Sequence, residues 1–235
     1  MDRLEDGMWW YEGLHAHLLF FLQQALVDTH YPLVLDAGCG SGGLLRILSH
    51  VMPPFCVLGL DADEGACVSA RMKSRCSVCV GSVNAMPFSD NTFTAIVSAD
   101  VLYHRDVDDV QALSNFYRCL ASGGTLLINL PAYQWLYSAH DRAVHTSRRY
   151  TKKRVNNLLR AAGFTVVKIT YWNTVLFPLM VLRRVLTRTK DGSDVIAYPK
   201  PVNLSFRVIM KFESALLRRG FTLPFGGSVL AFAVK

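Results

Sequence analysis

Short apolar stretches alternate with longer helix-like segments along most of this chain. The predicted strands cover residues 33–37, 56–60, 76–81, 95–99, 125–130, 164–171 and 228–234, and the predicted helices cover residues 9–27, 43–50, 62–74, 107–120 and 152–162. Because strands joined by helical crossovers pair in parallel, the alternation predicts an α/β fold with a mostly parallel sheet and helices on both faces. The last strand follows a long excursion instead of a short crossover, so we expect it to run antiparallel.

A glycine-rich turn follows the first predicted strand, in the sequence LVLDAGCGSGG at residues 33–43. Glycine allows positive φ and a close approach of the backbone to a ligand, and the N-terminus of the next helix presents free N–H groups. Glycines at 38, 40 and 43 fit a dinucleotide pattern, whereas Asp36 with glycines at 38, 40 and 42 fits an S-adenosylmethionine pattern. The glycines alone do not decide between these ligands.

Acidic residues beside the turn favour the second pattern. Asp36 stands two residues before the first glycine, where a carboxylate repels a pyrophosphate but can hold the ammonium group of a methionine moiety. Asp61 ends the next predicted strand, 23 residues after Gly38, and can accept hydrogen bonds from both ribose hydroxyls. The third predicted strand runs into GSVNAMPF at residues 81–88.

With these motifs, residues 30–170 resemble the class I S-adenosylmethionine-dependent methyltransferases, and most closely the type 11 small-molecule group that includes ubiquinone-biosynthesis-like O-methyltransferases. The resemblance implies a Rossmann-like sheet of seven strands with the cofactor across the carboxyl ends of the first strands. It implies cofactor-binding roles for Asp36, Gly38, Gly40, Gly42, Asp61, Ala62, Ser82, Val83 and Asp100. Ser82 departs from the family pattern, which usually has an acid there to bind the adenine amino group.

The segment after the fifth predicted strand, residues 131–150, is dense in aromatic and titratable side chains. Loops at the carboxyl ends of strands form the ligand crevice in open α/β sheets. We therefore expect substrate-binding residues here, namely Tyr133, Trp135, His145, Arg148, Arg149 and Tyr150. His140, Asp141 and His104 are the candidate catalytic residues, since a hydroxyl acceptor needs a general base. The alternative is that His140–Asp141 and Arg148–Tyr150 fasten the loop to the domain.

Charge is unevenly distributed along the chain. Residues 1–141 carry 7 Lys and Arg against 15 Asp and Glu, whereas residues 142–219 carry 17 against 3. This asymmetry indicates an anionic partner for the second half, although a solvated basic face is the alternative. Residues 173–223 contain two apolar and basic stretches, which suit a lid, a substrate wall or peripheral contact with an anionic membrane, or else two ordinary helices.

The length of 235 residues suits a single domain. We divide it into an N-terminal helical cap (1–30), a cofactor-binding core (31–172), a basic amphipathic helical insertion (173–223) and a last strand (224–235).

The location that we expect is cytoplasmic, peripheral to the inner face of a membrane. No apolar run approaches the roughly 20 residues of a spanning helix, and the first ten residues lack the apolar core of a signal peptide. We expect the six cysteines to be buried thiols, and the lone Cys76-x-x-Cys79 pattern predicts no metal site.

We expect a methyltransferase for a small-molecule or lipid-like, anionic acceptor, acting at oxygen or nitrogen. The alternatives are an NAD(P)-dependent oxidoreductase, a nucleic-acid-binding protein or RNA methyltransferase that uses the basic half, and a cofactor-binding protein without catalysis. The chain contains no N-P-P-Y-type tetrapeptide and no recognisable RNA-binding module, so we expect no nucleic acid partner.

Overall fold

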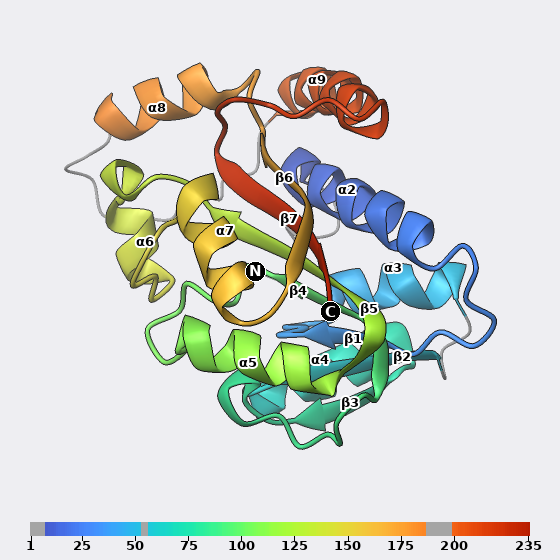
Figure 1. The fold of residues 1–235 in the computed structure, drawn as a ribbon. Coiled ribbons are helices and arrows are strands. Elements are labelled where there is room, and N and C mark those ends of the chain that lie inside the picture. Colours follow the sequence, from blue (N-terminus) through green and yellow to red (C-terminus); the bar gives the residue numbers. More distant parts are fainter. Residues whose placement is uncertain (1–7, 53–55, 187–198) are drawn as a thin grey trace.

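A computed structural model describes residues 8–52, 56–186 and 199–235 and contains one seven-stranded sheet. The strands are β1 (Val34–Ala37), β2 (Val57–Asp61), β3 (Ser77–Val80), β4 (Phe93–Ala99), β5 (Leu120–Pro131), β6 (Thr165–Trp172) and β7 (Ser228–Val234). They lie in the order β3-β2-β1-β4-β5-β7-β6. The first five pair in parallel, and β7 runs antiparallel between β5 and β6. The predicted Rossmann-like fold with an antiparallel last strand is therefore confirmed (Figure 1).

Two strands begin earlier than the sequence predicts. β4 begins at Phe93 and β5 at Leu120, and these two residues pair with each other. The glycines at 123 and 124 suggest a turn that would interrupt a strand, but β5 continues through them. The pairing register between β4 and β5 shifts at this point. Gly123 has φ +74°, a conformation that glycine adopts at no steric cost.

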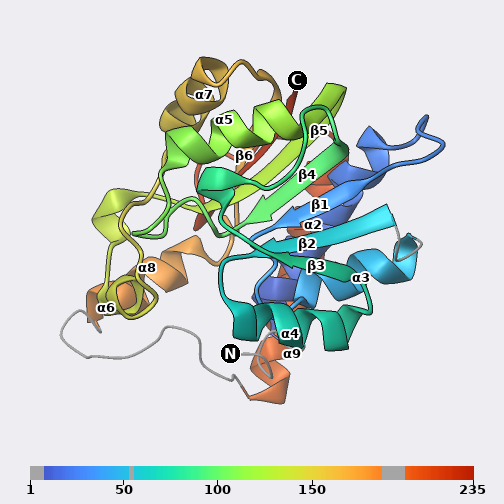
Figure 2. The same ribbon diagram turned by 90° about the horizontal axis from the view of Figure 1, so that it is seen from below.

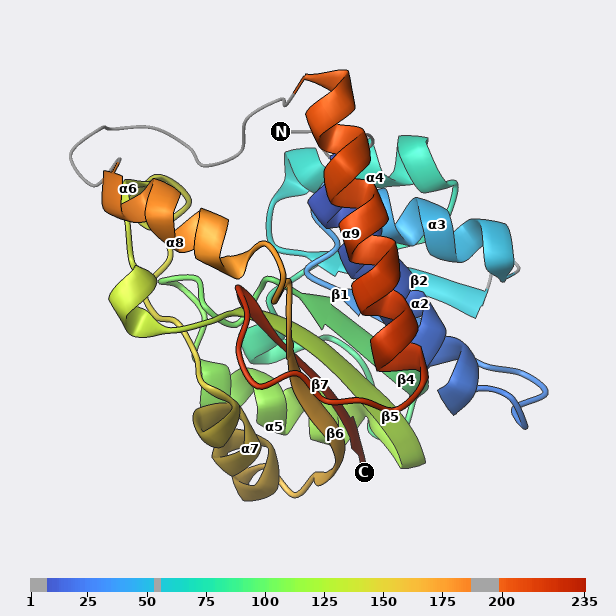
Figure 3. The same ribbon diagram turned by 90° about the horizontal axis from the view of Figure 1, so that it is seen from above.

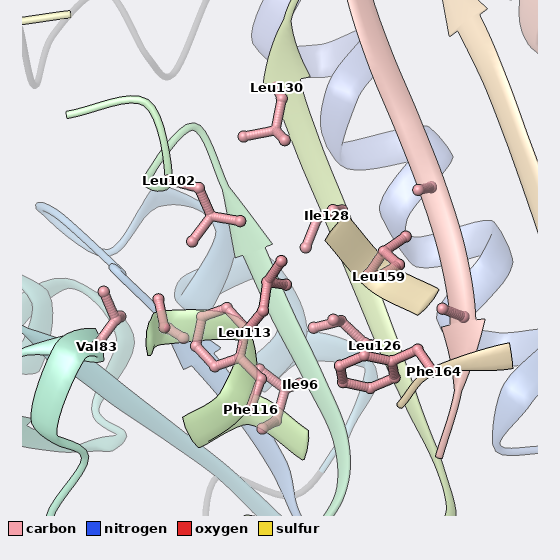
Figure 4. Close-up of a cluster of buried hydrophobic side chains, with 14 of the residues drawn as sticks. Val83, Ile96, Leu102, Leu113, Phe116, Leu126, Ile128, Leu130, Leu159 and Phe164 are labelled. Carbon is pink, nitrogen blue, oxygen red and sulfur yellow. The ribbon is translucent and has the colours of Figure 1, made fainter. Parts of the chain in front are cut away.

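Helices cover both faces of the sheet. α5 (Asp109–Cys119) and α7 (Lys152–Ala161) cover one face, whereas α2 (Trp9–Ala25), α3 (Gly43–Val51) and α4 (Glu64–Ser74) lie on the other (Figure 1). Each face has its own hydrophobic core. Figure 4 shows the first, in which Phe116 and Leu113 of α5 meet Ile96 and Leu126 of the strands.

Two further helices lie outside these layers on one side of the molecule, where Figure 3 shows them in front. α9 (Lys200–Arg218) packs on α2: the ring centroids of Trp9 and Phe206 lie 5.4 Å apart, and Arg207 forms an ion pair of 2.6 Å with Glu12. α8 (Phe177–Leu186) follows β6. Both helices fall within the predicted insertion at 173–223, while the four-part division of the chain itself stays a prediction.

The carboxyl ends of the parallel strands meet at one edge of the sheet. Figure 2 shows β4 pointing toward the side of the molecule that carries α8 and a short helix, α6 (Ala139–Ala143), which the sequence analysis does not predict. The turns that follow β1 to β5 therefore lie at this edge. Among the described helices, none has the length and apolar character needed to cross a bilayer.

Candidate functional site

The turn after β1 contains three glycines with positive φ: +83° at Gly38, +51° at Gly40 and +86° at Gly42. Gly38 and Gly42 allow close packing, because a Cβ atom at Gly38 would overlap the Val101 side chain and one at Gly42 would lie 2.7 Å from the Cα of Ala70. Gly40 differs, since a Cβ atom there would meet no protein atom within 4 Å. Its backbone therefore borders open space, into which a ligand can approach.

Asp61 at the end of β2 faces this turn. Its Oδ2 accepts a hydrogen bond of 2.8 Å from the backbone N–H of Gly40, and its Oδ1 accepts one of 3.0 Å from that of Asp63. Asp36, at the end of the neighbouring β1, has a side chain that is only 2% exposed. Burial raises the pKa of the Cys39 thiol well above its usual range, and the nearby Asp36 and Asp61 carboxylates add to the increase.

The residues present fit S-adenosylmethionine better than a dinucleotide. Two carboxylates stand near the carboxyl ends of the neighbouring strands β1 and β2: Asp61 binds the turn at Gly40 and suits ribose hydroxyls, and Asp36, two residues before Gly38, suits an ammonium group but would repel a pyrophosphate. Gly40 provides the space that a Cβ atom would fill. The individual cofactor roles, including that of the exposed neighbour Ala62, stay predictions.

The turn after β3 holds the predicted adenine contacts, Ser82 and Val83. Ser82 caps a single 3-10 turn, and its Oγ accepts a hydrogen bond of 3.1 Å from the backbone N–H of Asn84. Asn84, which the sequence analysis does not single out, donates to the Asp106 carbonyl (2.9 Å) and accepts from the Asp108 N–H (3.1 Å). Because the Ser82 hydroxyl keeps its own hydrogen, it can still donate to a ligand.

Asp100 follows β4 and lies in the left-handed region, with φ +59°. Both of its carboxylate oxygens accept from the Nδ2 of Asn129, at 3.1 and 3.2 Å. Burial raises the pKa of Asp100 to about 7, although the Asn129 hydrogen bond and the charge of Arg149 oppose the increase. The Oδ1 of Asn129 accepts from the indole N–H of Trp172 at 2.7 Å, so the orientation of this fully buried amide is fixed.

The structure brings the candidate His104 next to the loop that contains His145. Backbone hydrogen bonds join Arg105 N–H to the His145 carbonyl (3.0 Å) and Ser147 N–H to the Tyr103 carbonyl (2.8 Å). Burial lowers the pKa of His104, against the opposing effect of the Asp100 and Val144 carbonyls. The lowered pKa favours the neutral imidazole at pH 7.

Asp141 and Arg149 bind each other inside the protein. Arg149 donates from Nε to Asp141 Oδ1 at 2.8 Å and from Nη2 to Oδ2 at 3.1 Å, and both side chains are at least 96% buried. Asp141 also accepts from the backbone N–H of Ser138 in a capping box that begins α6, the helix in which His140 lies. Arg184 of α8 lies 3.7 Å from the same carboxylate. Through Asp141 and Arg149 these contacts hold the loop, while the predicted catalytic roles of His140 and Asp141 and the substrate-binding role of Arg149 stay predictions.

Arg148 and Tyr150 also bind protein groups. The Nη1 of Arg148 lies 3.2 Å from Oδ1 of the buried Asp109, and its Nη2 donates to the Val107 carbonyl at 2.8 Å. The hydroxyl of Tyr150 donates to Oδ2 of Asp109 at 2.9 Å, and its side chain is fully buried. Arg105 and Arg142 are exposed and are better candidates to bind a substrate anion. Both are joined to His145 by backbone hydrogen bonds: the Arg105 N–H donates to the His145 carbonyl, and the His145 N–H donates to the Arg142 carbonyl.

Tyr133 and Trp135 lie in an aromatic cluster beside α8. The Tyr133 ring stacks on Tyr171 with centroids 5.0 Å apart, and both Tyr133 and Trp135 contact Phe177, at 5.7 and 6.2 Å. Tyr133 has φ +58°, which is rare for a bulky residue, and Trp135 is 57% exposed. The two rings therefore border the loop on the side of α8, where an apolar acceptor can pack.

Asn129, which holds Asp100, is not among the site residues predicted from the sequence. Its signal is a polar side chain inside a run of apolar strand residues, LLINL, because a buried amide needs partners. Among the described residues, no cluster of His, Cys, Asp or Glu has an arrangement that can hold a metal ion, and all six cysteines are free thiols.

Comparisons with known proteins agree with this geometry. Residues 34–124 match a family model described as "Methyltransferase domain". A "Probable S-adenosylmethionine-dependent methyltransferase" of Mycolicibacterium smegmatis is 29% identical over 57% of this chain and 52% of its own. A "Probable tRNA methyltransferase 9B" of Mus musculus is 34% identical over 47% of this chain and 23% of its own. The chain thus spans about half or less of the length of these curated relatives.

Solved structures share the fold. Geranyl diphosphate C-methyltransferase from Streptomyces coelicolor, solved with Mg²⁺, geranyl diphosphate and S-adenosyl-L-homocysteine, superposes with a TM-score of 0.62 at 15% identity. The similarity covers 91% of this chain and 76% of that one. At this identity the similarity shows the fold alone.

Proposed function

Because this chain belongs to the class I S-adenosylmethionine-dependent methyltransferases, we propose that it methylates an oxygen or nitrogen of an anionic, lipid-like or other small acceptor. The observation that carries the proposal is the turn after β1, where Gly40 borders open space and its N–H binds Asp61. Such a turn can hold a nucleoside with a cationic methionine moiety between Asp36 and Asp61. When bound, S-adenosylmethionine supplies a methyl group on a sulfonium centre.

The chain contributes positioning and a proton acceptor. An in-line displacement depends mainly on holding the acceptor in the correct orientation. His104, whose lowered pKa keeps it neutral at pH 7, is the candidate that can accept a proton on a ring nitrogen from a hydroxyl acceptor. His140 is the second candidate, whereas the carboxylate of Asp141 is already bound by Arg149.

The side chains around the loop support an anionic, partly apolar acceptor. Tyr133 and Trp135 offer ring faces, and the exposed Arg105 and Arg142 offer positive charge on either side of His145. An acceptor with an apolar body and an anionic group would use both features. Peripheral membrane contact, which the sequence analysis expects for residues 173–223, would bring such acceptors within reach.

A second candidate function is methylation of RNA. The relative named as a tRNA methyltransferase favours it, as does the excess of positive charge in residues 142–219. Phosphate contacts make RNA affinity fall steeply with salt concentration. RNA binding that weakens by a large factor between 50 and 200 mM salt, together with methyl transfer to RNA, would therefore replace the lipid-like acceptor in the proposal.

Calorimetric titration of S-adenosylhomocysteine, with NADH in parallel, tests the cofactor. We expect S-adenosylhomocysteine alone to bind, and binding of NADH instead would refute the proposal. Transfer of labelled methyl from S-adenosylmethionine to separate lipid, small-metabolite and RNA fractions of a cell extract then tests the acceptor class. We expect label in an acidic, lipid-like or small-molecule fraction, and an Arg105→Ala/Arg142→Ala variant should lower that incorporation without weakening S-adenosylhomocysteine binding.

A further inference from the structure

The outward face of α9 exposes a stripe of apolar side chains. Leu204, Val208 and Phe212 lie four residues apart, on one side of the helix, and are 61%, 60% and 62% exposed. The opposite side holds Met210 and Leu217, which are buried in the core beneath it. Large apolar side chains that gather on one exposed face mark an interaction surface.

α8 and the turn before it expose a second stripe. Val175, Leu179 and Leu182 are 50%, 51% and 56% exposed. On the inward side, Phe177 contacts the rings of Tyr133 and Trp135, and Arg184 donates to the Leu136 carbonyl at 2.7 Å. Both helices that carry these stripes lie in front in Figure 3, on the same side of the molecule.

Positive charge accompanies both stripes. On α9 and at its C-terminal end, Lys211, Arg218 and Arg219 are exposed, and α8 carries the partly exposed Arg183. Over the residues of these two helices the sequence contains one acid, Glu213, and its side chain is fully buried. An exposed apolar stripe bordered by basic residues is the pattern of helices that lie at an anionic lipid surface.

Glu213 joins the two helices into one unit. From α9 its carboxylate accepts hydrogen bonds from the backbone N–H groups of Asn173, Thr174 (2.8 Å) and Val175 (3.2 Å), at the entry to α8. α8 in turn contacts the predicted substrate-binding residues Tyr133 and Trp135. A surface that binds both stripes would therefore lie beside the crevice at the carboxyl edge of the sheet.

We infer that the outward faces of α8 and α9 dock on an anionic phospholipid bilayer. We call this surface, formed by Val175, Leu179, Leu182, Leu204, Val208, Phe212 and Lys211, the docking face. Its exposed residues are mainly aliphatic, which suits insertion among acyl chains better than stacking on the bases of RNA. The delivery of a membrane-borne acceptor to the crevice rests on the proposed function, whereas the docking itself does not.

Co-sedimentation with vesicles of phosphatidylcholine, with and without 30 mol% phosphatidylglycerol, tests the inference. We expect the protein to pellet with the anionic vesicles and to remain largely in the supernatant with the neutral ones. A Val208→Asp/Phe212→Asp variant should lose at least about tenfold in partition coefficient, because it removes apolar contact and adds negative charge. The matched control Met72→Asp, at a side chain that is 80% exposed on α4, should bind vesicles as the unchanged protein does.

The outcomes separate docking from catalysis. Equal binding of neutral and anionic vesicles, or unchanged binding by the Val208→Asp/Phe212→Asp variant, would refute the docking face. Salt-sensitive binding of RNA without vesicle binding would refute it as well and favour the RNA function. S-adenosylhomocysteine titration of both variants shows that they fold, and a protein that binds anionic vesicles but no S-adenosylhomocysteine would retain the docking face and lose the proposed function.

Discussion

The carboxylate of Asp61 accepts a hydrogen bond from the backbone N–H of Gly40, with 2.8 Å between Gly40 N and Asp61 Oδ2. This contact joins the ends of two neighbouring parallel strands, and it fixes the glycine turn relative to a side chain that is expected to hold the ribose. Asp61 thus has two functions in this proposal. It shapes the turn, and its carboxylate oxygens have further lone pairs that can accept from ribose hydroxyls.

Asp61→Asn should weaken S-adenosylhomocysteine binding roughly 10- to 100-fold, because hydrogen bonds to a charged acceptor contribute about 1.5–3 kcal/mol. The asparagine keeps an oxygen for the Gly40 N–H, so the fold should persist. Calorimetry measures the affinity, and Asp90→Asn, at an exposed carboxylate paired with Arg118, is the control. Equal affinities of the two variants would remove Asp61 from the binding site.

Gly40 and Gly42 should respond differently to substitution by alanine. Both have positive φ, so each alanine costs about 1–2 kcal/mol of backbone strain. Gly42→Ala also brings its Cβ to 2.7 Å from Ala70, which adds about 1–3 kcal/mol of overpacking. Gly40→Ala should therefore be destabilised less than Gly42→Ala, by the backbone strain alone, but lose most of its affinity for S-adenosylhomocysteine.

Chemical denaturation and calorimetry on both glycine variants check this difference. The reverse order of stabilities would mean that the open space at Gly40 is filled by the protein itself. Retained affinity in Gly40→Ala would mean that the ligand does not approach this part of the turn.

The partly buried carboxyl of Asp100 should make stability depend on pH. Its pKa in the folded protein is about 7, well above the value of about 3.9 in an unfolded chain, so the folded state holds the proton more tightly. Its contribution to stability is complete below about pH 4 and is lost as the pH rises through 7. The contribution of Asp100 to the unfolding free energy should therefore fall between pH 5 and pH 8.

Asp100→Asn isolates the contribution of Asp100 to this pH dependence. Asparagine tolerates the φ of +59° and carries no titrating proton, so the variant should exceed the unchanged protein in stability by on the order of 2 kcal/mol at pH 8, and by less at pH 5. Urea denaturation at both pH values measures the difference. A stability difference that does not change with pH would show that Asp100 is ionised throughout this range.

Much of the fold can be predicted from the sequence because local patterns determine it. The bounds of β7 match the expected residues 228–234, and Thr151 begins α7 by accepting from the Arg154 N–H. The start of β5 cannot be read in this way, because Gly123 and Gly124 suggest a turn. There the strand is held by pairing with β4, a contact that the local sequence does not reveal.

Some residues of the candidate site can likewise be predicted from the sequence, and others cannot. The glycine turn and Asp61 follow from the ends of successive strands, which the topology brings together. Asn129 does not, because its partners Asp100 and Trp172 lie 29 and 43 residues away along the chain. The predicted role of Arg149 in substrate binding likewise depends on which groups surround its guanidinium in the folded protein. The sequence does not indicate that the Asp141 carboxylate binds this guanidinium.

The buried pair of Arg149 and Asp141 supports a last prediction, on stability. Removing one partner of a buried ion pair is strongly destabilising, and Arg149→Met leaves Asp141 with only the longer 3.7 Å contact to Arg184. The variant should therefore cost toward the lower end of about 3–5 kcal/mol of unfolding free energy. An Arg149→Met/Asp141→Leu double variant should regain at least about half of that loss, since it removes both charges, although the α6 cap is lost with Asp141. Asp90→Ala, which breaks an exposed pair, should cost less than about 1 kcal/mol. If Arg149→Met instead keeps full stability and lowers only methyl transfer, Arg149 binds the acceptor, and the Asp141 carboxylate does not need the Arg149 charge for the protein to be stable.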